Sequence, residues 1–542
     1  DHRVEGGAIT SSDKDQKGRF HLTPHQFRSL RSLAMYADFL LSSLGHWAKT
    51  HLATSTLLVA LSVGWILHWI INRPHRNLKL PPGPWISVPW LGYLPFLGTD
   101  FVKGFARLSK KYGPVYRLEL GQRSVLVLND FPSVKEAFMQ RAFLGRPPNP
   151  PNHLLQDATS FSVSNGVVWR EQKNFALHVM RDLGFGKTRM EVHIKEEIAH
   201  LVSELEEFEG RPANVRRYLA PSTSNNISAL IFGRRLDYHD PMRVELDEVI
   251  TELIRFFRPT SLHAWFPGIK TILFKLKLFD YDKLEYAIKH LLKFIAKEID
   301  EHESTLDANC IRDYMDGFLL QLRQREYRDA NTSFTKAMLK GNCPSLIGAG
   351  STTVRATMEW LMLTMAEFQD FQSRVHAEID EVVGRERTPD WADHVKMPFT
   401  EAVLMEVQRW KTVVPINLLR YTTEPARVSG YDIPAGMTTI ANIHAIHNDP
   451  AYWDRPDLFK PERFLSEDGK EVVKNDCWIP FSLGKRACPG ETLANVELFL
   501  YFTCLLQKFH IVFPEGKRHN FQGRVGATFE PLPYKLCMIP RK

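Results

Sequence analysis

The stretch Phe481–Gly490 reads FSLGKRACPG, and the run Glu491–Leu506, ETLANVELFLYFTCLL, follows it directly. This second run is long, mostly apolar and free of Gly and Pro, which predicts a buried helix. Pro489 suits the first turn of that helix, because its missing N–H would be unpaired there anyway. Cys488 is therefore expected at a helix N-terminus, where free N–H groups and the positive end of the helix dipole favour a thiolate.

A buried structural cysteine is the alternative, and Cys488 alone would not decide against it. The spacing does, because Phe481, Gly484, Arg486, Cys488 and Gly490 follow the pattern FxxGxRxCxG. This pattern is typical of the cytochrome P450 (heme-thiolate monooxygenase) family, which the sequence resembles. The resemblance implies that heme b is the cofactor and that Cys488 supplies its axial thiolate. It also implies that Gly484 allows a tight turn, that Arg486 meets a heme propionate, and that Phe481 and Gly490 belong to the same cofactor-binding loop.

The composition is that of a globular protein. The chain has 542 residues, of which 44% are hydrophobic and 24% charged. A net charge of +7, from 69 basic and 62 acidic residues without a large basic cluster, argues against nucleic-acid binding. The six cysteines are scattered and form no CxxC pair. That pattern argues against a disulfide framework or a zinc site and fits a reducing compartment.

A membrane anchor is predicted near the N-terminus. Leu52–Ile71 contains 20 residues and no Asp, Glu, Lys or Arg, which is enough to span a bilayer. Basic residues follow this run more densely than they precede it, so the positive-inside rule places the bulk of the chain in the cytosol. A cleaved signal peptide and a buried core helix are the alternatives; no small-residue cleavage site is clear.

The regions on either side of this anchor complete the predicted organisation. Residues 1–34 are polar and lack periodicity, and we expect residues 1–51 to form a disordered extension, with Met35 as the natural start of the protein. A transit peptide is the alternative, but the acidic residues of this region do not suit one. Residues 72–84 form a basic, Pro-rich linker that we expect to orient the remaining residues, 85–542, as a single catalytic domain.

A long helix is predicted over Leu346–Leu363 despite two glycines, Gly348 and Gly350, which lower helix stability. We interpret them as a sign of a flat ligand close to the helix or of a local opening. The family pattern here is AGx(D/E)T. Matching it places Thr353 at the oxygen-side threonine and Thr352 at the position of the acid, a departure from the pattern. The alternative for Thr353 is a hydroxyl bonded back to its own helix.

Other positions are assigned through the same resemblance. Gly166–Lys187 resembles the helix whose WxxxR motif faces the propionates, with Trp169 at the aromatic position. Lys173 stands where the family has arginine, which keeps the charge and loses the bidentate fork. Arg420 matches a residue that reaches a propionate. A core aromatic is the alternative for Trp169.

An ExxR pair and a later PERF motif point to a structural triad. Glu406 and Arg409 lie three residues apart on a predicted helix and so share a face. Alone such a pair is usually solvated. Followed by PERF at Pro461–Phe464 and then by the cysteine loop, it resembles the family trademark. That resemblance implies a structural ion-pair triad of Glu406, Arg409 and Arg463 beneath the heme.

The motifs most resemble those of the animal microsomal branch, including family-2-type enzymes. The resemblance implies a mainly α fold with small β-sheets, anchored by one N-terminal transmembrane helix in the endoplasmic reticulum membrane. It implies insertion of one atom of O₂ into a small molecule, with electrons from NADPH through a cytochrome P450 reductase and with cytochrome b5 as a further partner. The chain has no GxGxxG unit of its own.

The substrate is expected to be lipophilic, because the segments that the family layout places above the heme are largely apolar. Two other functions stay open at this point. One is a heme-thiolate isomerase or dehydratase that acts on a peroxide without a reductase, which the missing acid at Thr352 allows; the other is a non-catalytic heme-binding protein. The segments that the family layout places above the heme are Pro147–Ser164, Phe256–Phe266, Pro344–Ala349, Val413–Leu418 and Val525–Glu530.

Overall fold

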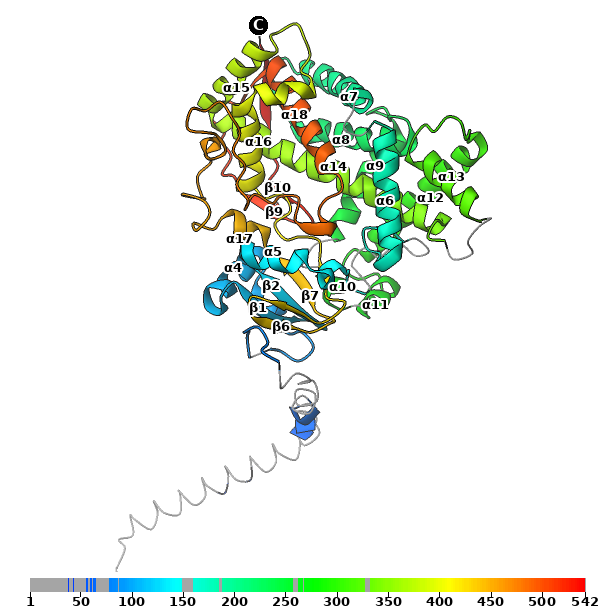
Figure 1. Ribbon diagram of the computed structural model, residues 1–542, viewed down its shortest axis with the longest axis vertical. Helices are drawn as coiled ribbons and strands as arrows, with labels where there is room; N and C mark the ends of the chain where they lie inside the picture. The colour runs from blue at the N-terminus through cyan, green and yellow to red at the C-terminus, as the bar shows by residue number, and fades with distance from the viewer. Residues whose placement is uncertain are drawn as a thin grey trace, which may run out of the picture. The chain divides into compact units, whose positions relative to one another are not determined.

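A helix of 32 residues, α14 (Lys336–Glu367), is the central element of the fold. It begins where the Thr335 side chain accepts a hydrogen bond from the Met338 N–H, which caps the helix. Every residue from Val354 to Ala366 is buried, as expected for a helix that is covered on all sides. In the computed structural model the helices α8 (Val215–Phe232), α16 (Pro398–Trp410) and α18 (Glu491–Lys508) pack against it (Figure 1).

The structure describes residues 78–85, 87–148, 159–184, 188–256, 262–266, 268–326 and 332–541, with a few positions before residue 65. The chain divides into two compact units, Asp1–Asn77 and Leu78–Lys542, which are treated separately. In the first unit the predicted extension and most of the predicted anchor Leu52–Ile71 lie outside the described residues. Among the described residues we find no helix that is long and apolar enough to cross a membrane. The anchor therefore stays a prediction.

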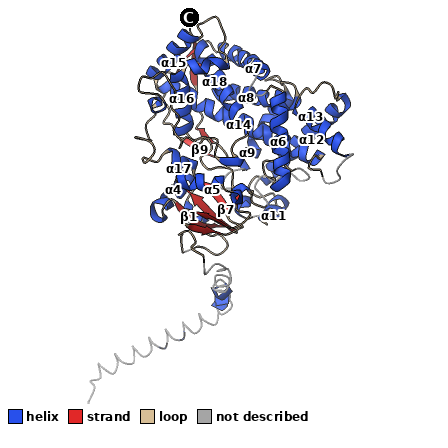
Figure 2. Ribbon diagram, in the orientation of Figure 1, coloured by secondary structure: helices blue, strands red, loops and turns tan. Residues whose placement is uncertain are grey.

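Most of the second unit is helical, which confirms the expected mainly α architecture with small sheets (Figure 2). The other described helices are α3 (Leu94–Leu97), α4 (Phe101–Tyr112), α5 (Phe131–Met139), α6 (Gly166–Asp182), α7 (Thr188–Glu206), α9 (Pro241–Phe256), α10 (Leu262–Trp265), α11 (Ile269–Lys275), α12 (Tyr281–Thr305), α13 (Tyr314–Glu326), α15 (Gln369–Val382) and α17 (Ile443–His447), with 3₁₀ turns η1 (Arg141–Leu144), η2 (Trp391–Lys396), η3 (Pro461–Phe464) and η4 (Gly484–Arg486).

The main sheet has the strand order β1-β2-β7-β4. Its first two strands form an antiparallel hairpin, β7 runs parallel to β2, and β4 pairs with β7. Three smaller sheets have the orders β3-β11-β8, β10-β9 and β5-β6. The strands are β1 (Val115–Leu120), β2 (Arg123–Leu128), β3 (Pro212–Ala213), β4 (Arg420–Tyr421), β5 (Ala426–Val428), β6 (Tyr431–Ile433), β7 (Thr438–Ala441), β8 (Phe509–Val512), β9 (Gly523–Val525), β10 (Phe529–Pro531) and β11 (Leu536–Pro540).

The boundaries of α14 differ from the predicted helix Leu346–Leu363. The helix begins ten residues earlier, and it contains Pro344. Proline normally ends or bends a helix, so the sequence pattern before it reads as a break. Burial of the segment around Pro344, including Asn342 and Cys343, outweighs that local preference.

Candidate active site

The loop before Cys488 has a backbone conformation that requires glycine at position 484. Gly484 has φ +74°, and a Cβ at this position would lie 2.2 Å from the carbonyl oxygen of Phe138 in α5. Only glycine fits so close to that backbone. The loop closes where the Cys488 N–H donates to the Phe481 carbonyl at 2.9 Å. The sequence FxxGxRxC thus encodes one tight turn that presents the Cys488 side chain.

The helix after this loop begins later than predicted. Gly490 caps α18 and Glu491 is its first residue, so Pro489 precedes the cap and is not in the first turn. Burial raises the pKa of the Cys488 thiol; the Gly490 N–H opposes this, and the charge of Glu491 adds to it. Burial thus opposes the favourable effect of the helix terminus that the sequence predicts. A cation bound at Sγ would be needed to hold the thiolate.

Two exposed side chains in otherwise buried surroundings mark open space within the fold. The Cys488 side chain is exposed although the atoms around it are dense enough to raise its pKa. Ala349 is exposed on α14, a few residues before the fully buried part of that helix. A Cβ on Gly348 would meet no atom within 4 Å. The open space beside Gly348 and Ala349 is called the hollow beside α14, and Cys488 is exposed on its own loop.

The two helix glycines have different roles. A Cβ on Gly350 would lie 2.4 Å from Cδ1 of Ile227 in α8, so this glycine lets two helices pack closely. Gly348 borders open space instead, and the helix α14 continues through it. The hydroxyl of Thr352 donates to the Gly348 carbonyl at 2.6 Å, and that of Thr353 donates to the Ala349 carbonyl at 2.8 Å. Both hydroxyls thus donate a hydrogen bond to their own helix. The lone pairs of each hydroxyl oxygen can still accept a hydrogen bond from another group.

Three buried arginines meet near the Cys488 loop, although no carboxylate among the described residues pairs with any of them. Arg420 in β4 donates to the Leu483 carbonyl at 2.7 Å, and Arg486 donates to the Ser164 carbonyl at 2.6 Å. Arg146 donates to three carbonyls, of Ser162, Leu418 and Leu419. Burial, together with the charge of Arg146, lowers the pKa of Arg420 to about 8 and that of Arg486 to about 9. Burial lowers the pKa of Arg146 to about 10.

Trp169 and Lys173 in α6 extend this cationic group. The guanidinium of Arg486 lies over the Trp169 ring at 3.8 Å from its centroid, and the Lys173 ammonium lies 5.7 Å from the same centroid. Lys173 also donates to the Lys485 carbonyl at 2.8 Å. Burial lowers the pKa of Lys173, and the charge of Arg486 lowers it further. The structure therefore brings Trp169, Lys173 and Arg486 together.

These residues fit a heme. Buried cations are stable when anions neutralise them, and here Nη1 of Arg420 has no hydrogen-bond partner in the structure. The two propionates of a heme would supply the missing negative charge, and a thiol lies nearby on a rigid loop. By contrast, a Cβ on Gly490 would lie 3.9 Å from Sγ, an ordinary contact, so the space around Sγ does not require glycine there.

Arg146 is a member of this group that the sequence analysis missed. It lies in GRPP, between α5 and the segment before α6, where the resemblance gives no motif. Its guanidinium is held by the carbonyls of Ser162, Leu418 and Leu419. Two of these lie more than 270 positions away in the sequence, and no local pattern predicts them. The only sequence signal is an arginine beside a Pro pair, and that is too common to interpret.

The predicted triad is in contact. Glu406 and Arg409 of α16 form a bidentate pair at 2.7 and 2.8 Å, and Arg463 of η3 donates to Glu406 at 3.1 Å. All three side chains are buried. Arg409 also donates to the His447 carbonyl at 2.7 Å. The triad therefore ties α16 to the segment before the cysteine loop.

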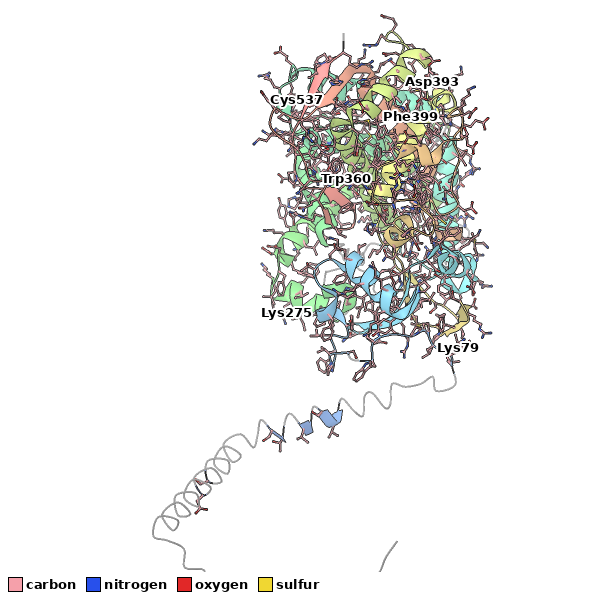
Figure 3. All side chains as sticks on the ribbon, turned by 90° about the vertical axis from the view of Figure 1, so that its left-hand side faces the viewer. Lys79, Lys275, Trp360, Asp393, Phe399 and Cys537 are labelled. Carbon is pink, nitrogen blue, oxygen red and sulfur yellow. The ribbon has the colours of Figure 1, made fainter. Side chains whose placement is uncertain are left out.

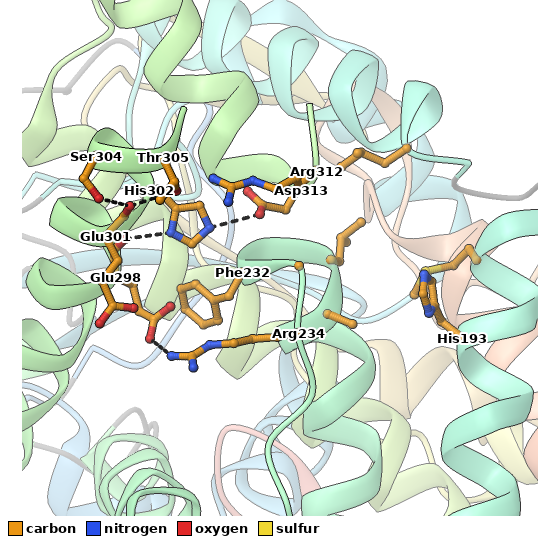
Figure 4. Close-up of a pocket in the computed structure, with 15 residues that line it drawn as sticks. His193, Phe232, Arg234, Glu298, Glu301, His302, Ser304, Thr305, Arg312 and Asp313 are labelled. Atoms are coloured by element: carbon orange, nitrogen blue, oxygen red, sulfur yellow. Dashed lines mark hydrogen bonds and ion pairs between the residues drawn. The ribbon is translucent and has the colours of Figure 1, made fainter. Parts of the chain in front are cut away.

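Parts of the predicted pocket lie elsewhere or outside the described residues. Residues 149–158 and 257–261 are not described. Trp265 belongs to the segment Phe256–Phe266, which was expected above the heme. Its side chain is buried against the main sheet, where its carbonyl accepts a hydrogen bond from the Gln122 N–H at 3.0 Å. A separate cavity of about 620 Å³ is lined by residues of α7, α8 and α12, among them His302, and by Asp313 just before α13 (Figure 4). It contains none of the predicted site residues.

Comparison with known proteins gives one consistent result. The family model described as cytochrome P450 matches residues 81–538. The chain is 34% identical over 509 residues to cytochrome P450 2J5 of Mus musculus, covering 91% of this chain and 97% of the relative. It is 32% identical to cytochrome P450 2U1 of Bos taurus (90% and 93% covered) and 30% identical to cytochrome P450 18a1 of Drosophila melanogaster (88% and 90%). The chain therefore belongs to the cytochrome P450 family, whose members are monooxygenases that bind heme b through a cysteine thiolate.

Proposed function

We propose that this enzyme is a membrane-anchored monooxygenase of the endoplasmic reticulum that inserts one oxygen atom into a lipophilic small molecule. NADPH supplies the electrons through a cytochrome P450 reductase, with cytochrome b5 as a further donor. The observation that carries the proposal is the Cys488 loop beside three buried arginines, none of which pairs with a carboxylate in the part of the chain that the structure describes. When bound there, heme supplies the activation of O₂.

The chain's own residues hold the cofactor in this proposal. Cys488 is the axial ligand on a loop fixed by the conformation of Gly484, with Phe481 and Gly490 at its ends. Arg420 and Arg486 neutralise the propionates. Lys173 adds a further positive charge near Arg486.

Arg146, which lowers the pKa of both other arginines, is the third cation for the propionates. Trp169 lies under the Arg486 guanidinium and orients it. The buried triad of Glu406, Arg409 and Arg463 keeps the fold around the loop rigid and performs no chemistry.

Thr353 and Thr352 handle protons in the hollow beside α14. The hydroxyl of Thr353 donates to its helix, so its lone pairs are left to accept a hydrogen bond from water or from a protonated oxygen. Thr352 carries no proton that ionises near neutral pH, so the proton must come from a more distant acid through water. General acid delivery of this kind is typically worth about 10² to 10⁴ in rate.

Exposed apolar side chains support a membrane location for the catalytic unit as well. Trp85 and Trp90 are 85% and 81% exposed, and Phe279, after α11, is 71% exposed. The helix α10 contacts the β1–β2 hairpin, as shown by the hydrogen bond from Arg123 Nε at the start of β2 to the Ala264 carbonyl at 2.8 Å. Aromatic side chains that remain exposed are suited to the interface of a bilayer.

The proposed reaction can be tested with purified protein, reductase, NADPH and isotopically labelled O₂. We expect NADPH-dependent products that carry one labelled oxygen atom. Product formed from a peroxide without NADPH would replace the monooxygenase proposal by the isomerase one. For the location, protease added to sealed microsomes should digest the catalytic unit; complete protection would reverse the proposed topology.

A further inference from the structure

Phe138, the last residue but one of α5, is a buried aromatic residue that was not among the predicted site residues. The guanidinium carbon of Arg420 lies 3.5 Å from the centroid of its ring. A guanidinium is attracted to the negative face of an aromatic ring, and the attraction is strongest where water is excluded. Both side chains are buried here. The Phe138 ring therefore supports the Arg420 guanidinium from one side.

The backbone of the same residue meets the Cys488 loop. A Cβ on Gly484 would lie 2.2 Å from the Phe138 carbonyl oxygen, so the loop approaches α5 as closely as a glycine allows. Arg420 donates to the Leu483 carbonyl of this loop at 2.7 Å. Three elements thus meet around Phe138: the helix α5, the strand β4 that carries Arg420, and the Cys488 loop.

These contacts hold the Arg420 guanidinium and leave one of its nitrogens without a partner. The backbone of Arg420 pairs with Thr439 of β7, and its Nη2 donates to the Leu483 carbonyl. Its Nη1 is buried and has no hydrogen-bond partner among the residues that the structure describes. The guanidinium is therefore fixed through its backbone, on one face and at Nη2, and Nη1 is left as a donor for an anion.

We infer that Phe138 is a positioning residue for the heme and that it acts through Arg420. Its ring holds the guanidinium so that Nη1 remains available to a propionate. Trp169 has the corresponding place under Arg486, at 3.8 Å, so each of these two arginines lies against an aromatic ring. The inference rests on the proposed function, because it assumes that Arg420 binds a propionate.

The experiment compares Phe138→Leu with wild type in the heme-loaded enzyme. Leucine keeps the side chain apolar and removes the aromatic face. We expect heme to pass from this variant to excess apomyoglobin about tenfold faster than from wild type, because the guanidinium is no longer held for the propionate. The reduction potential of the heme should fall as well, since a guanidinium that moves away no longer favours the added negative charge of reduced iron.

Two further substitutions at the same position complete the test. Phe138→Tyr keeps an aromatic face, so its heme transfer rate and reduction potential should stay close to those of wild type. If Phe138→Leu does not fold, Phe138→Met fills more of the same space without a ring and should change both values in the direction expected for leucine.

The matched control is Phe399→Leu in α16. The Arg374 guanidinium lies 3.7 Å from the Phe399 ring centroid, so the same kind of contact is lost, but Arg374 also pairs with Glu462 at 2.5 Å. Figure 3 places Phe399 near the upper end of the fold. This variant should transfer heme at the wild-type rate and keep the wild-type reduction potential.

The variant Arg420→Gln separates failure of the inference from failure of the proposed function. In this background Phe138→Leu should change neither value further, because the residue through which Phe138 acts is already absent. If Arg420→Gln alters heme transfer and reduction potential while a folded Phe138→Leu alters neither, the inference is overturned and the role of Arg420 stands. If Arg420→Gln itself leaves both values unchanged, the proposed propionate contact is rejected, and the inference with it. Equal changes in Phe399→Leu and Phe138→Leu would also overturn the inference.

Discussion

Replacing Arg409 by alanine tests whether the triad holds the fold or takes part in the chemistry. The guanidinium makes two bonds to Glu406 and further bonds to the His447 and Pro456 carbonyls, and it is fully buried. Breaking a buried pair costs about 3–5 kcal/mol. Glu406 keeps Arg463 at 3.1 Å, so the lower end of that range applies.

The carbonyl groups add to this loss. Each buried acceptor that loses its donor costs about 1–3 kcal/mol, and two of them are affected. The expected destabilisation is therefore about 5–9 kcal/mol, against a total of about 5–15 kcal/mol for a typical protein. We expect Arg409→Ala to unfold at much lower urea concentration than wild type and to retain little heme. Urea unfolding followed by circular dichroism, together with heme content per chain, measures both effects.

A surface arginine provides the control for this substitution. Arg385 pairs with Asp380 at 2.9 Å, but both side chains are exposed, and such pairs contribute about 0–1 kcal/mol. Arg385→Ala should therefore unfold close to wild type. If Arg409→Ala were equally stable and fully loaded with heme, the structural role would be refuted. Slow turnover in such a variant would assign the triad a part in the reaction.

Three further predictions concern single residues. Cys488→Ser should abolish the carbon-monoxide absorption band typical of thiolate-bound heme; a variant that keeps the band would show that another residue is the ligand. Thr353→Ala should keep consuming NADPH while product falls and hydrogen peroxide rises, and an unchanged product yield per NADPH would remove Thr353 from proton transfer. Both ring nitrogens of His302 face acceptors, the Glu298 carbonyl at 2.7 Å and Asp313 at 3.0 Å. Burial lowers its pKa, but Asp313 more than offsets this and the pKa is raised overall. The stabilisation by His302 should thus be complete below about pH 6.5 and lost as the pH rises through the raised pKa, so His302→Gln should cost more unfolding free energy at pH 6 than at pH 9; an equal cost at both would contradict a charged His302.

Much of the site could be predicted because the motif residues act locally. Gly484 is required by the positive φ of its own turn, and the ExxR pair meets through helix periodicity. The start of α18 and the pKa of Cys488 could not be predicted in the same way. Burial is the main cause of the raised pKa of the Cys488 thiol, whereas the sequence shows only the favourable effect of a helix terminus. Arg146 was missed because two of its three carbonyl partners, Leu418 and Leu419, lie more than 270 residues away in the sequence.

Charge balance separates the two groups of buried arginines in this enzyme. Arg409 and Arg463 share Glu406, so the chain itself supplies their counter-charge and they need no ligand to be stable. Arg146, Arg420 and Arg486 donate mainly to carbonyl oxygens and pair with no carboxylate among the described residues, and burial lowers the pKa of each. A buried cation without an anion costs free energy. The two propionates of a heme would neutralise this second group of arginines. The same residue type thus has a structural role in one place and a cofactor-binding role in the other, and the difference lies in the partner that the fold supplies.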